Sequence, residues 1–443
     1  MFSDGLWRMR KTLKNLDIDV GTSGTEVPLA YVLLVSDTLT HLRYQTFGGD
    51  LENAIGNFSV VSENHPLMSL DISNCNVRGR DIEIVLGRCQ KIHQLMMDQC
   101  EVSVLEPISR FATNLEILVL NHRDCIPTVP DYDTDNSNKG KSVTRRSSTT
   151  TGLKVLVSNC SFHHFSASDL FPIIYKNRAT LQSIFANVHG DLPPSQSRQF
   201  DIIYPKFKLE NVTSIVINLP PRLQPFLLRS LSNSTSSLIN FGALNVTNIN
   251  PLIHFVTDYL NQQQQRPIQA LKLFNADIHS NITTRRSLIQ LFQRYTKMSN
   301  DGSNSLRHVD IQYCHGMTDS ILLALGEIKT LKNIVFTLLF GITSQGMYGF
   351  IRKLARHQQV ISISFDDLDC VDDYIIASLG EIDSLTDIRL ERLQNVTGEG
   401  IRYLIDRKGS KLKTLILRNC FSISQDFICF AKQKLETFEY DYF

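Results

Sequence analysis

The feature that most constrains the fold is a spacing of apolar residues that recurs along nearly the whole chain. An apolar residue is followed by a second three positions later and by a third two positions after that, in the pattern L-x-x-L-x-L. The clearest copies begin at Leu67, Leu115, Leu306, Leu331, Leu385 and Leu412. Weaker or imperfect copies begin at Leu13, Leu39, Ile92, Leu153, Leu181, Val212, Leu238, Ile268, Val360 and Leu435. These sixteen starts lie roughly 28 residues apart on average, which indicates a repeat architecture.

The spacing predicts what each repeat folds into. The last two apolar residues of a copy are two positions apart, so on a β-strand both point into the core. Helical spacing then follows, as in Leu252-Phe255-Val256-Leu260. Each unit is therefore expected to be a strand, a turn and a returning helix that shares a core with its neighbours. Because helices pack further apart than strands, we expect an α/β leucine-rich-repeat solenoid, a horseshoe with parallel strands on the concave face and helices on the convex face. Residues 1–443 are expected to form a single domain of about sixteen repeats.

Four cysteines lie eight residues after a repeat start, namely Cys75, Cys100, Cys314 and Cys420. A small, weakly polar side chain fits a buried turn there, so we predict that these cysteines are structural. The stretch from Leu306 to Asp319 resembles the cysteine-containing leucine-rich repeat with its trailing C-x-x-(I/L/M)-T-D, and Leu412 to Cys420 is similar. Such repeats are typical of the ribonuclease-inhibitor-like superfamily, and especially of F-box leucine-rich-repeat proteins. The resemblance implies a substrate or partner receptor of a cullin-type ubiquitin ligase.

The chain departs from that family at its start. An F-box is a helical module of about 40 to 50 residues that normally precedes the repeats. The first repeat here begins at Leu13, which leaves no room for one upstream. Either the module has been lost, or the sequence is truncated, or the protein has no link to a ligase. If an F-box is missing, the ligase adaptor that binds F-boxes would be a further partner; without a ligase link, a scaffold or a small-GTPase regulator is expected.

Composition excludes several classes of function. Hydrophobic residues make up 42% of the chain and the formal net charge is +1. A near-zero charge argues against general binding to nucleic acid or an anionic membrane, since both favour a basic excess. The nine cysteines are an odd number, the N-terminal segment does not resemble a signal peptide, and the early apolar run from Val27 to Val35 is too short to span a bilayer. We therefore expect a cytoplasmic or nuclear protein.

Two gaps between repeat starts are longer than the others. The first holds a polar stretch at about 123–152, which we expect to be a disordered loop. Within it, Arg145-Arg146-Ser147-Ser148 resembles a site for a basophilic kinase, although a solvated loop is the favoured interpretation. The second gap, from Ile268 to Leu306, is explained by a longer helix followed by a loop.

No motif for catalysis, a cofactor or a metal is complete. Gly140-Lys141-Ser142 lacks the upstream glycine of a phosphate-binding loop, and Cys160, His163 and His164 lack a fourth ligand. An acidic cluster lacks the glycine and the terminal glutamate of a calcium loop, so a solvated turn is favoured for Asp366, Asp367, Asp369, Asp372 and Asp373. We therefore expect a binding protein without a cofactor or metal, and not an enzyme.

Residues two, four and six positions after each start should face outward on the concave side, where a protein partner would bind. The fourth position is apolar in five consecutive repeats, at Met96, Val119, Val157, Phe185 and Val216. The sixth position of the same repeats forms a polar rim of Asp98, Asn121, Asn159, Asn187 and Asn218. An apolar strip edged by polar groups is a candidate contact surface, although β-branched residues also favour strands in general and the loop near residue 130 is a candidate cover. A charged alternative comprises Asp366, Asp387, Arg389, Glu391 and Arg418.

Overall fold

The computed structural model describes most of the chain, and the chain divides into two compact units. The described residues are 2–19, 27–46, 50–120, 152–158, 165–188, 208–218, 228, 231, 238–246, 248–261, 267–278, 282–301, 305–420 and 422–441. The first unit comprises Met1–Val212 with Asn233–Ser236, and the second comprises Thr213–Ser232 with Ser237–Phe443. The loop predicted at about 123–152, with its kinase-like sequence, falls almost wholly outside the described residues, as do Cys160, His163 and His164.

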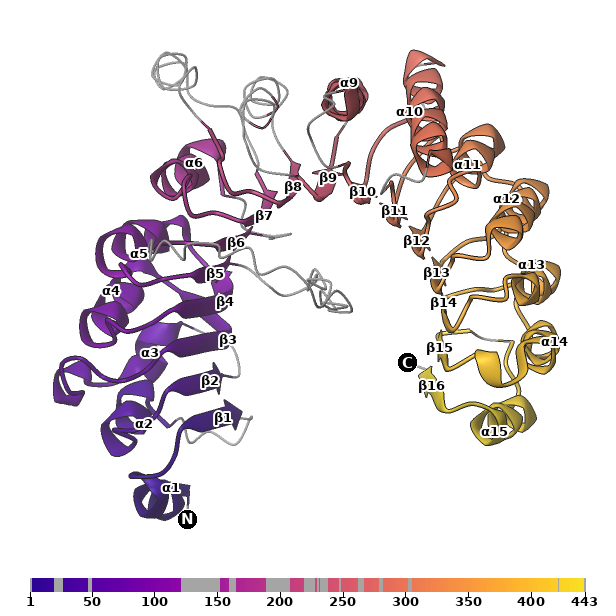
Figure 1. Cartoon of the computed structure of the whole chain (residues 1–443). Coiled ribbons are helices and arrows are strands. Elements are labelled where there is room, and N and C mark those ends of the chain that lie inside the picture. The colour runs from indigo at the N-terminus through magenta and orange to yellow at the C-terminus, as the bar shows by residue number, and fades with distance from the viewer. Residues whose placement is uncertain are drawn as a thin grey trace, which may run out of the picture. The chain divides into compact units, whose positions relative to one another are not determined.

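The described part of the first unit is a parallel sheet with helices on one side (Figure 1). Its strands pair in chain order and all in parallel: β1 (Asn15–Asp19), β2 (His41–Gln45), β3 (Ser69–Val77), β4 (Gln94–Cys100), β5 (Ile117–Leu120), β6 (Val155–Ser158) and β7 (Ser183–Asn187). The helices are α1 (Phe2–Met9), α2 (Leu29–Val35), α3 (Leu51–Ile55), α4 (Gly79–Arg88), α5 (Leu105–Phe111) and α6 (Ala167–Lys176). Short 3-10 turns lie at η1 (Phe58–Val60) and η2 (Val102–Val104).

The second unit repeats this plan. Its strands, again parallel and in chain order, are β8 (Ser214–Asn218), β9 (Asn240–Leu244), β10 (Ala270–Phe274), β11 (His308–Gln312), β12 (Asn333–Thr337), β13 (Ser362–Asp366), β14 (Asp387–Glu391), β15 (Thr414–Arg418) and β16 (Thr437–Asp441). The helices are α9 (Asn250–Asn261), α10 (Ile282–Asn300), α11 (Asp319–Leu325), α12 (Ser344–His357), α13 (Asp373–Ser378), α14 (Gly398–Lys408) and α15 (Gln425–Lys434), with 3-10 turns at η4 (Leu379–Glu381) and η5 (Gly409–Lys411).

Each of these sixteen strands begins two residues after one of the sixteen predicted repeat starts. The stretch from Leu252 to Leu260, predicted as helical from its spacing, lies in α9. The 19-residue α10 also accounts for most of the long gap between Ile268 and Leu306. Both units therefore have the repeating strand–turn–helix plan of the α/β class. The chain is a leucine-rich-repeat solenoid.

The four cysteines predicted to be structural are all buried free thiols. Burial raises the pKa of the Cys75 and Cys314 thiols to about 12, so both stay protonated at neutral pH. The Cys314 thiol donates to the backbone carbonyl of Gln312, with a sulfur–oxygen distance of 3.3 Å. Cys420 makes the equivalent bond to the Arg418 carbonyl at 3.5 Å, whereas Cys75 and Cys100 are buried within β3 and β4. Burial of all four thiols supports a structural role.

The residue immediately after several strands has a left-handed backbone. In the second unit the φ angle is 54° at Tyr313, 45° at Leu338 and 51° at Asp367. This turn aims each backbone N–H at the last carbonyl of the next strand, as in the 2.8 Å bond from Tyr313 N to the Thr337 carbonyl oxygen. The turn therefore links each repeat to the next through backbone bonds.

Successive helices of the second unit are linked by a repeated side-chain bond. Asp319 accepts from the backbone N–H and the hydroxyl of Thr343, at 2.9 and 2.7 Å. Asp373 accepts from the same two groups of Thr397, at 2.7 and 2.6 Å. Asp372 accepts from the Ile375 N–H at the start of α13. Two members of the predicted acidic turn therefore hold helices in place.

Candidate partner-binding surfaces

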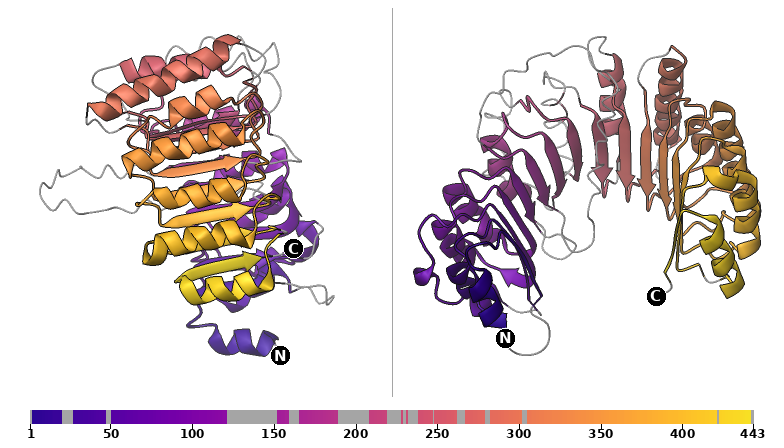
Figure 2. Two further views of the ribbon diagram at one scale, coloured as in Figure 1. Left: turned by 90° about the vertical axis from the view of Figure 1, so that its right-hand side faces the viewer. Right: turned by 60° about the horizontal axis from the view of Figure 1, so that its bottom comes forward.

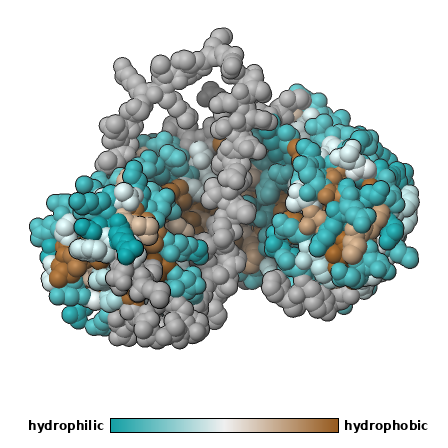
Figure 3. All heavy atoms as spheres, turned by 90° about the horizontal axis from the view of Figure 1, so that it is seen from below, coloured by the Kyte–Doolittle hydropathy of each residue, from teal (hydrophilic) through white to brown (hydrophobic). Residues whose placement is uncertain are grey.

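The surface of the sheet opposite the helices is here called the strand face (Figure 2). In β7, β11, β13 and β15 buried and half-buried residues alternate, so the second, fourth and sixth positions of these repeats point away from the core, as predicted. Figure 3 shows a mainly polar surface over the described residues, with hydrophobic areas that are small and separate. The strand face therefore carries side chains that the core does not require.

The predicted apolar strip is continuous within the first unit. Met96 is in register with Val119, Val119 with Val157, and Val157 with Phe185. Val119 and Val157 are each only 7% exposed, whereas Met96 and Phe185 at the ends are half-buried. The strip therefore offers contact area mainly at its two ends.

The fifth predicted strip residue, Val216, belongs to the second unit. It lies in register with Gly242 of β9 and is 6% exposed. A Cβ placed on Gly242 would lie 3.0 Å from both Cγ atoms of Val216 and 2.9 Å from the Cβ of Lys272. The side chains of Val216 and Lys272 therefore pack against the β9 backbone from both sides. Little of the Val216 side chain is exposed for contact with a partner.

The predicted polar rim is only partly within the described residues. Asp98 accepts the backbone N–H of Asn74 through Oδ2 at 2.7 Å. This hydrogen bond lies beside an irregularity in the register between β3 and β4. One carboxylate oxygen of Asp98 therefore stabilises the turn within the sheet. Asn187 is half-buried and Asn218 is 9% exposed. Asn121 and Asn159 lie outside the described residues.

The predicted charged patch lies over β13 to β15, and ion pairs connect its residues with one another and with β16. Arg389 contacts Glu391 at 2.9 Å, and Arg418 contacts Asp441 at 3.4 Å. Arg392, which the alternating pattern did not single out, bridges the Asp366 and Glu391 carboxylates at 2.6 and 2.9 Å. The strand register places Asp366 beside Glu391, and Glu391 beside Arg418. Glu391 therefore joins Arg389 and Arg392 in one network, beside the separate ion pair of Arg418 with Asp441.

Asp366 has the most perturbed carboxylate of this network. Burial raises the pKa of Asp366 to about 6, with Arg392 opposing the rise and Glu391 adding to it. Its Oδ2 contacts Arg392, while its Oδ1 is buried and makes no hydrogen bond. The Arg392 guanidinium therefore compensates only part of the cost of burying this charge.

Within the described ranges, no group of three or more His, Cys, Asp or Glu residues is arranged to hold a metal ion. No helix in that part of the chain is long and apolar enough to cross a membrane. The charged groups described above instead form hydrogen bonds and ion pairs with one another.

Comparison with known proteins adds little beyond this geometry. No protein-family model matches the chain, and no curated protein matches it. Among solved structures, it is similar to a yeast complex of Rad7 and Elc1, with 14% identity, a TM-score of 0.35, and coverage of 98% of this chain and 76% of that chain. It is also similar to an internalin (inlF) from Listeria monocytogenes, with 13% identity, a TM-score of 0.32, and coverage of 99% and 94%. Likenesses this weak carry no argument about function.

Proposed function

We propose that the chain is a repeat scaffold that binds a protein partner through its strand faces. The observation that carries this proposal is the in-register alignment of outward side chains that the core does not need. In the second unit these side chains include Arg389, Glu391 and Arg418, and in the first unit they include Met96 and Phe185. Arginine and aromatic residues with neighbouring charges are typical of protein interfaces.

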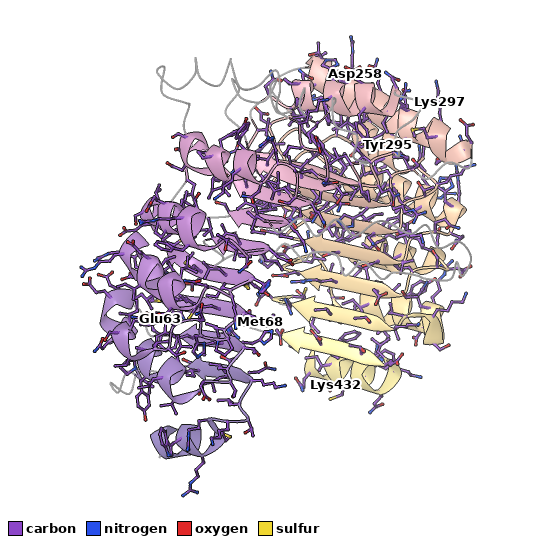
Figure 4. The ribbon with its side chains drawn as sticks, turned by 60° about the vertical axis from the view of Figure 1, so that its left-hand side comes forward. Glu63, Met68, Asp258, Tyr295, Lys297 and Lys432 are labelled. Atoms are coloured by element: carbon purple, nitrogen blue, oxygen red, sulfur yellow. The ribbon has the colours of Figure 1, made fainter. Side chains whose placement is uncertain are left out.

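The test is affinity capture on the immobilised full chain, compared between variants by quantitative mass spectrometry. One variant carries Arg389→Glu with Arg418→Glu, and another carries Phe185→Asp. The control carries Lys297→Glu with Lys432→Glu, which reverses two exposed charges on α10 and α15 (Figure 4). A partner that the wild type and the control retain, but that either strand-face variant loses, supports the proposal. Equal recovery by all four proteins overturns it.

We also propose a finer role, as a substrate or partner receptor of F-box leucine-rich-repeat type in ubiquitin-dependent degradation in the cytoplasm or nucleus. Its support is the cysteine-containing repeat from Leu306 to Asp319, in which Cys314 is buried. Capture of the adaptor that binds F-boxes, and a longer half-life of the partner when this protein is depleted, are the expected results. An unchanged half-life would instead favour a ligase-independent scaffold, and a captured small GTPase would favour a regulator of that class.

A further inference from the structure

The carboxyl ends of β10, β11 and β12 carry a cluster of aromatic side chains, here called the aromatic edge: Phe274, Tyr313, His315 and Phe340. The Phe274 and Tyr313 rings meet edge to face with their centroids 5.1 Å apart. The His315 and Phe340 rings are stacked, with centroids 4.8 Å apart and planes 3° from parallel. Tyr313 and His315 both follow β11 and are two residues apart, so both pairs include a residue from the turn after β11. The strands of this unit point the same way, and their carboxyl ends lie along one side of the sheet (Figure 2).

These rings are not packed away in the core. Phe340 is 45% exposed, His315 is also exposed, and Phe274 and Tyr313 are half-buried. Stacking on His315 covers one face of the Phe340 ring only in part, so the ring keeps much of its surface in solvent. Contiguous exposed aromatic surface of this kind is typical of contact sites.

The backbone at Tyr313 is a second sign that its side chain matters for more than the turn. The corresponding left-handed position holds asparagine in four other repeats, at Asn74, Asn245, Asn275 and Asn419. Asparagine enters this conformation readily, whereas other L-residues are disfavoured there by about 1–2 kcal/mol. Tyrosine is thus a less stable choice than asparagine for the turn, as are Leu338 and Arg392 in two nearby repeats, and what tyrosine supplies is a half-buried aromatic ring.

The surroundings of the aromatic edge are acidic. Positions six to nine of the repeats that contain β10 to β14 hold five carboxylates, at Asp277, Asp366, Asp367, Asp369 and Glu391. The only lysine or arginine at these positions is Arg392, which is engaged by Asp366 and Glu391. Asp277 pairs with His315 in an isolated backbone bridge, and Asp369 is exposed at the position of its repeat that Phe340 occupies in the preceding one. The repeats on either side of those that carry His315 and Phe340 therefore each supply a carboxylate.

We infer that the aromatic edge binds a basic segment of the protein partner, with an arginine or lysine side chain over the Phe340 or Tyr313 ring. A cation over an aromatic face is attracted by the ring and gains about 0.5–2 kcal/mol depending on its desolvation. The carboxylates of Asp277 and Asp369 would attract a basic segment over a longer range and would repel an acidic one. This inference rests on the proposed function, because it names the chemistry of the partner and a second surface, at the border of the strand face, that the partner uses.

The test uses the full chain and two fluorescein-labelled peptides of equal length, one of alternating glycine with arginine and lysine, and one with glutamate in their place. We expect fluorescence anisotropy to detect the basic peptide only. Phe340→Ala should weaken its binding about fivefold, since removal of a cation–π contact costs about 1 kcal/mol. Tyr374→Ala, at a tyrosine on α13 that is 62% exposed, should leave binding unchanged. Equal affinity for both peptides, or equal effects of the two substitutions, overturns the inference.

Tyr313→Asn separates a binding role from a structural one. If the ring serves the partner, this substitution raises the melting temperature because asparagine relieves the left-handed turn, while it weakens binding of the basic peptide. If the ring serves only the fold through Phe274, the melting temperature falls and peptide binding is unchanged, which overturns the inference. A partner that is captured through the charged patch while the basic peptide is not bound would overturn only this inference and leave the proposed function standing.

Discussion

The strand faces of the two units are built on the same repeat but filled differently. In the first unit the middle of the face is an apolar row, and its central valines, Val119 and Val157, are almost completely covered. In the second unit the face over β13 to β16 carries ion-paired arginines and carboxylates and remains open at Arg389. The repeat constrains the inward positions in both units, and the outward positions are free to vary. Outward side chains therefore distinguish a face that supports the fold from one that is available for recognition.

The largest expected difference is for a charge placed at the fourth position of a strand. Val157→Asp puts a carboxylate between Val119 and Phe185, and we expect a loss of about 3 kcal/mol or more in the free energy of unfolding. The matched substitution in the second unit, Ser364→Asp, lies beside Arg389 and should change the free energy by less than about 0.5 kcal/mol. Urea denaturation measures both. Equal effects would show that the two faces do not differ in burial.

A glycine-to-alanine substitution is expected to lower the free energy of unfolding at one position in the second unit and to raise it at one position in the first unit. A Cβ on Gly400 would lie 2.7 Å from the Cα of Asp373 and 2.6 Å from its Oδ1, which also bonds the Thr397 N–H. Gly400→Ala should therefore cost about 2–3 kcal/mol by overpacking. Gly87 in α4 has open space around it, so Gly87→Ala should stabilise by about 0.5–1 kcal/mol through helix propensity. Thermal denaturation compares the two, and a stabilising Gly400→Ala would contradict the close helix contact.

Two buried tyrosines should respond differently to loss of the hydroxyl. Tyr44 in the first unit donates to the Val27 carbonyl at 2.8 Å, so Tyr44→Phe should destabilise by about 1 kcal/mol. Tyr295 in the second unit belongs to α10 (Figure 4) and is fully buried, and its hydroxyl has no hydrogen-bond partner. Tyr295→Phe should therefore be neutral or stabilising by up to about 1 kcal/mol. A clear loss of stability in Tyr295→Phe would indicate a bond to its hydroxyl.

The smallest expected effect is a change in the free energy of unfolding with pH, and one buried group in each unit contributes to it with opposite sign. In the first unit His65 is buried, with Nε2 at 3.2 Å from the Leu33 and Ser36 carbonyl oxygens and Nδ1 accepting from the Leu67 N–H. Burial lowers the pKa of His65, so the unfolded chain takes up this proton first as the pH falls below about 6.5, and stability is lost. In the second unit the raised pKa of Asp366 means that the folded chain takes up the proton first, and stability is gained as the pH falls through about 6.

Urea denaturation between pH 7 and pH 5 checks this pair. His65→Gln should reduce the loss of stability at low pH, and Asp366→Asn should remove a gain. The same measurements at high salt separate the effect of burial from the effect of neighbouring charges. Salt screens the interactions of Asp366 with Arg392 and Glu391, but it does not change the effect of burial. A pH profile that neither substitution alters would contradict both assignments.

The sequence predicts the inward half of each repeat well and the outward half poorly. Every strand begins where the spacing of apolar residues places it, since burial of those residues is what stabilises the stack. The alternating pattern did not predict the low exposure of Val119 and Val157, although the sequence left a cover over this strip as an alternative. Arg392 and Tyr313 were missed because they follow the strand in a left-handed turn, where the alternation of inward and outward positions ends. Asparagine at the equivalent position of other repeats was the signal that could have identified this turn.

Photo-crosslinking in cells tests the central claim most directly. A photoreactive phenylalanine analogue is placed at Phe185 on the strand face, at Phe340 on the aromatic edge, and at Tyr374 on the exposed side of α13. The account predicts that one protein partner is crosslinked through Phe340 or Phe185 and is not crosslinked through Tyr374. Crosslinking of the partner through Tyr374 alone would contradict the account, because it would place recognition on the helices and not on the strand face.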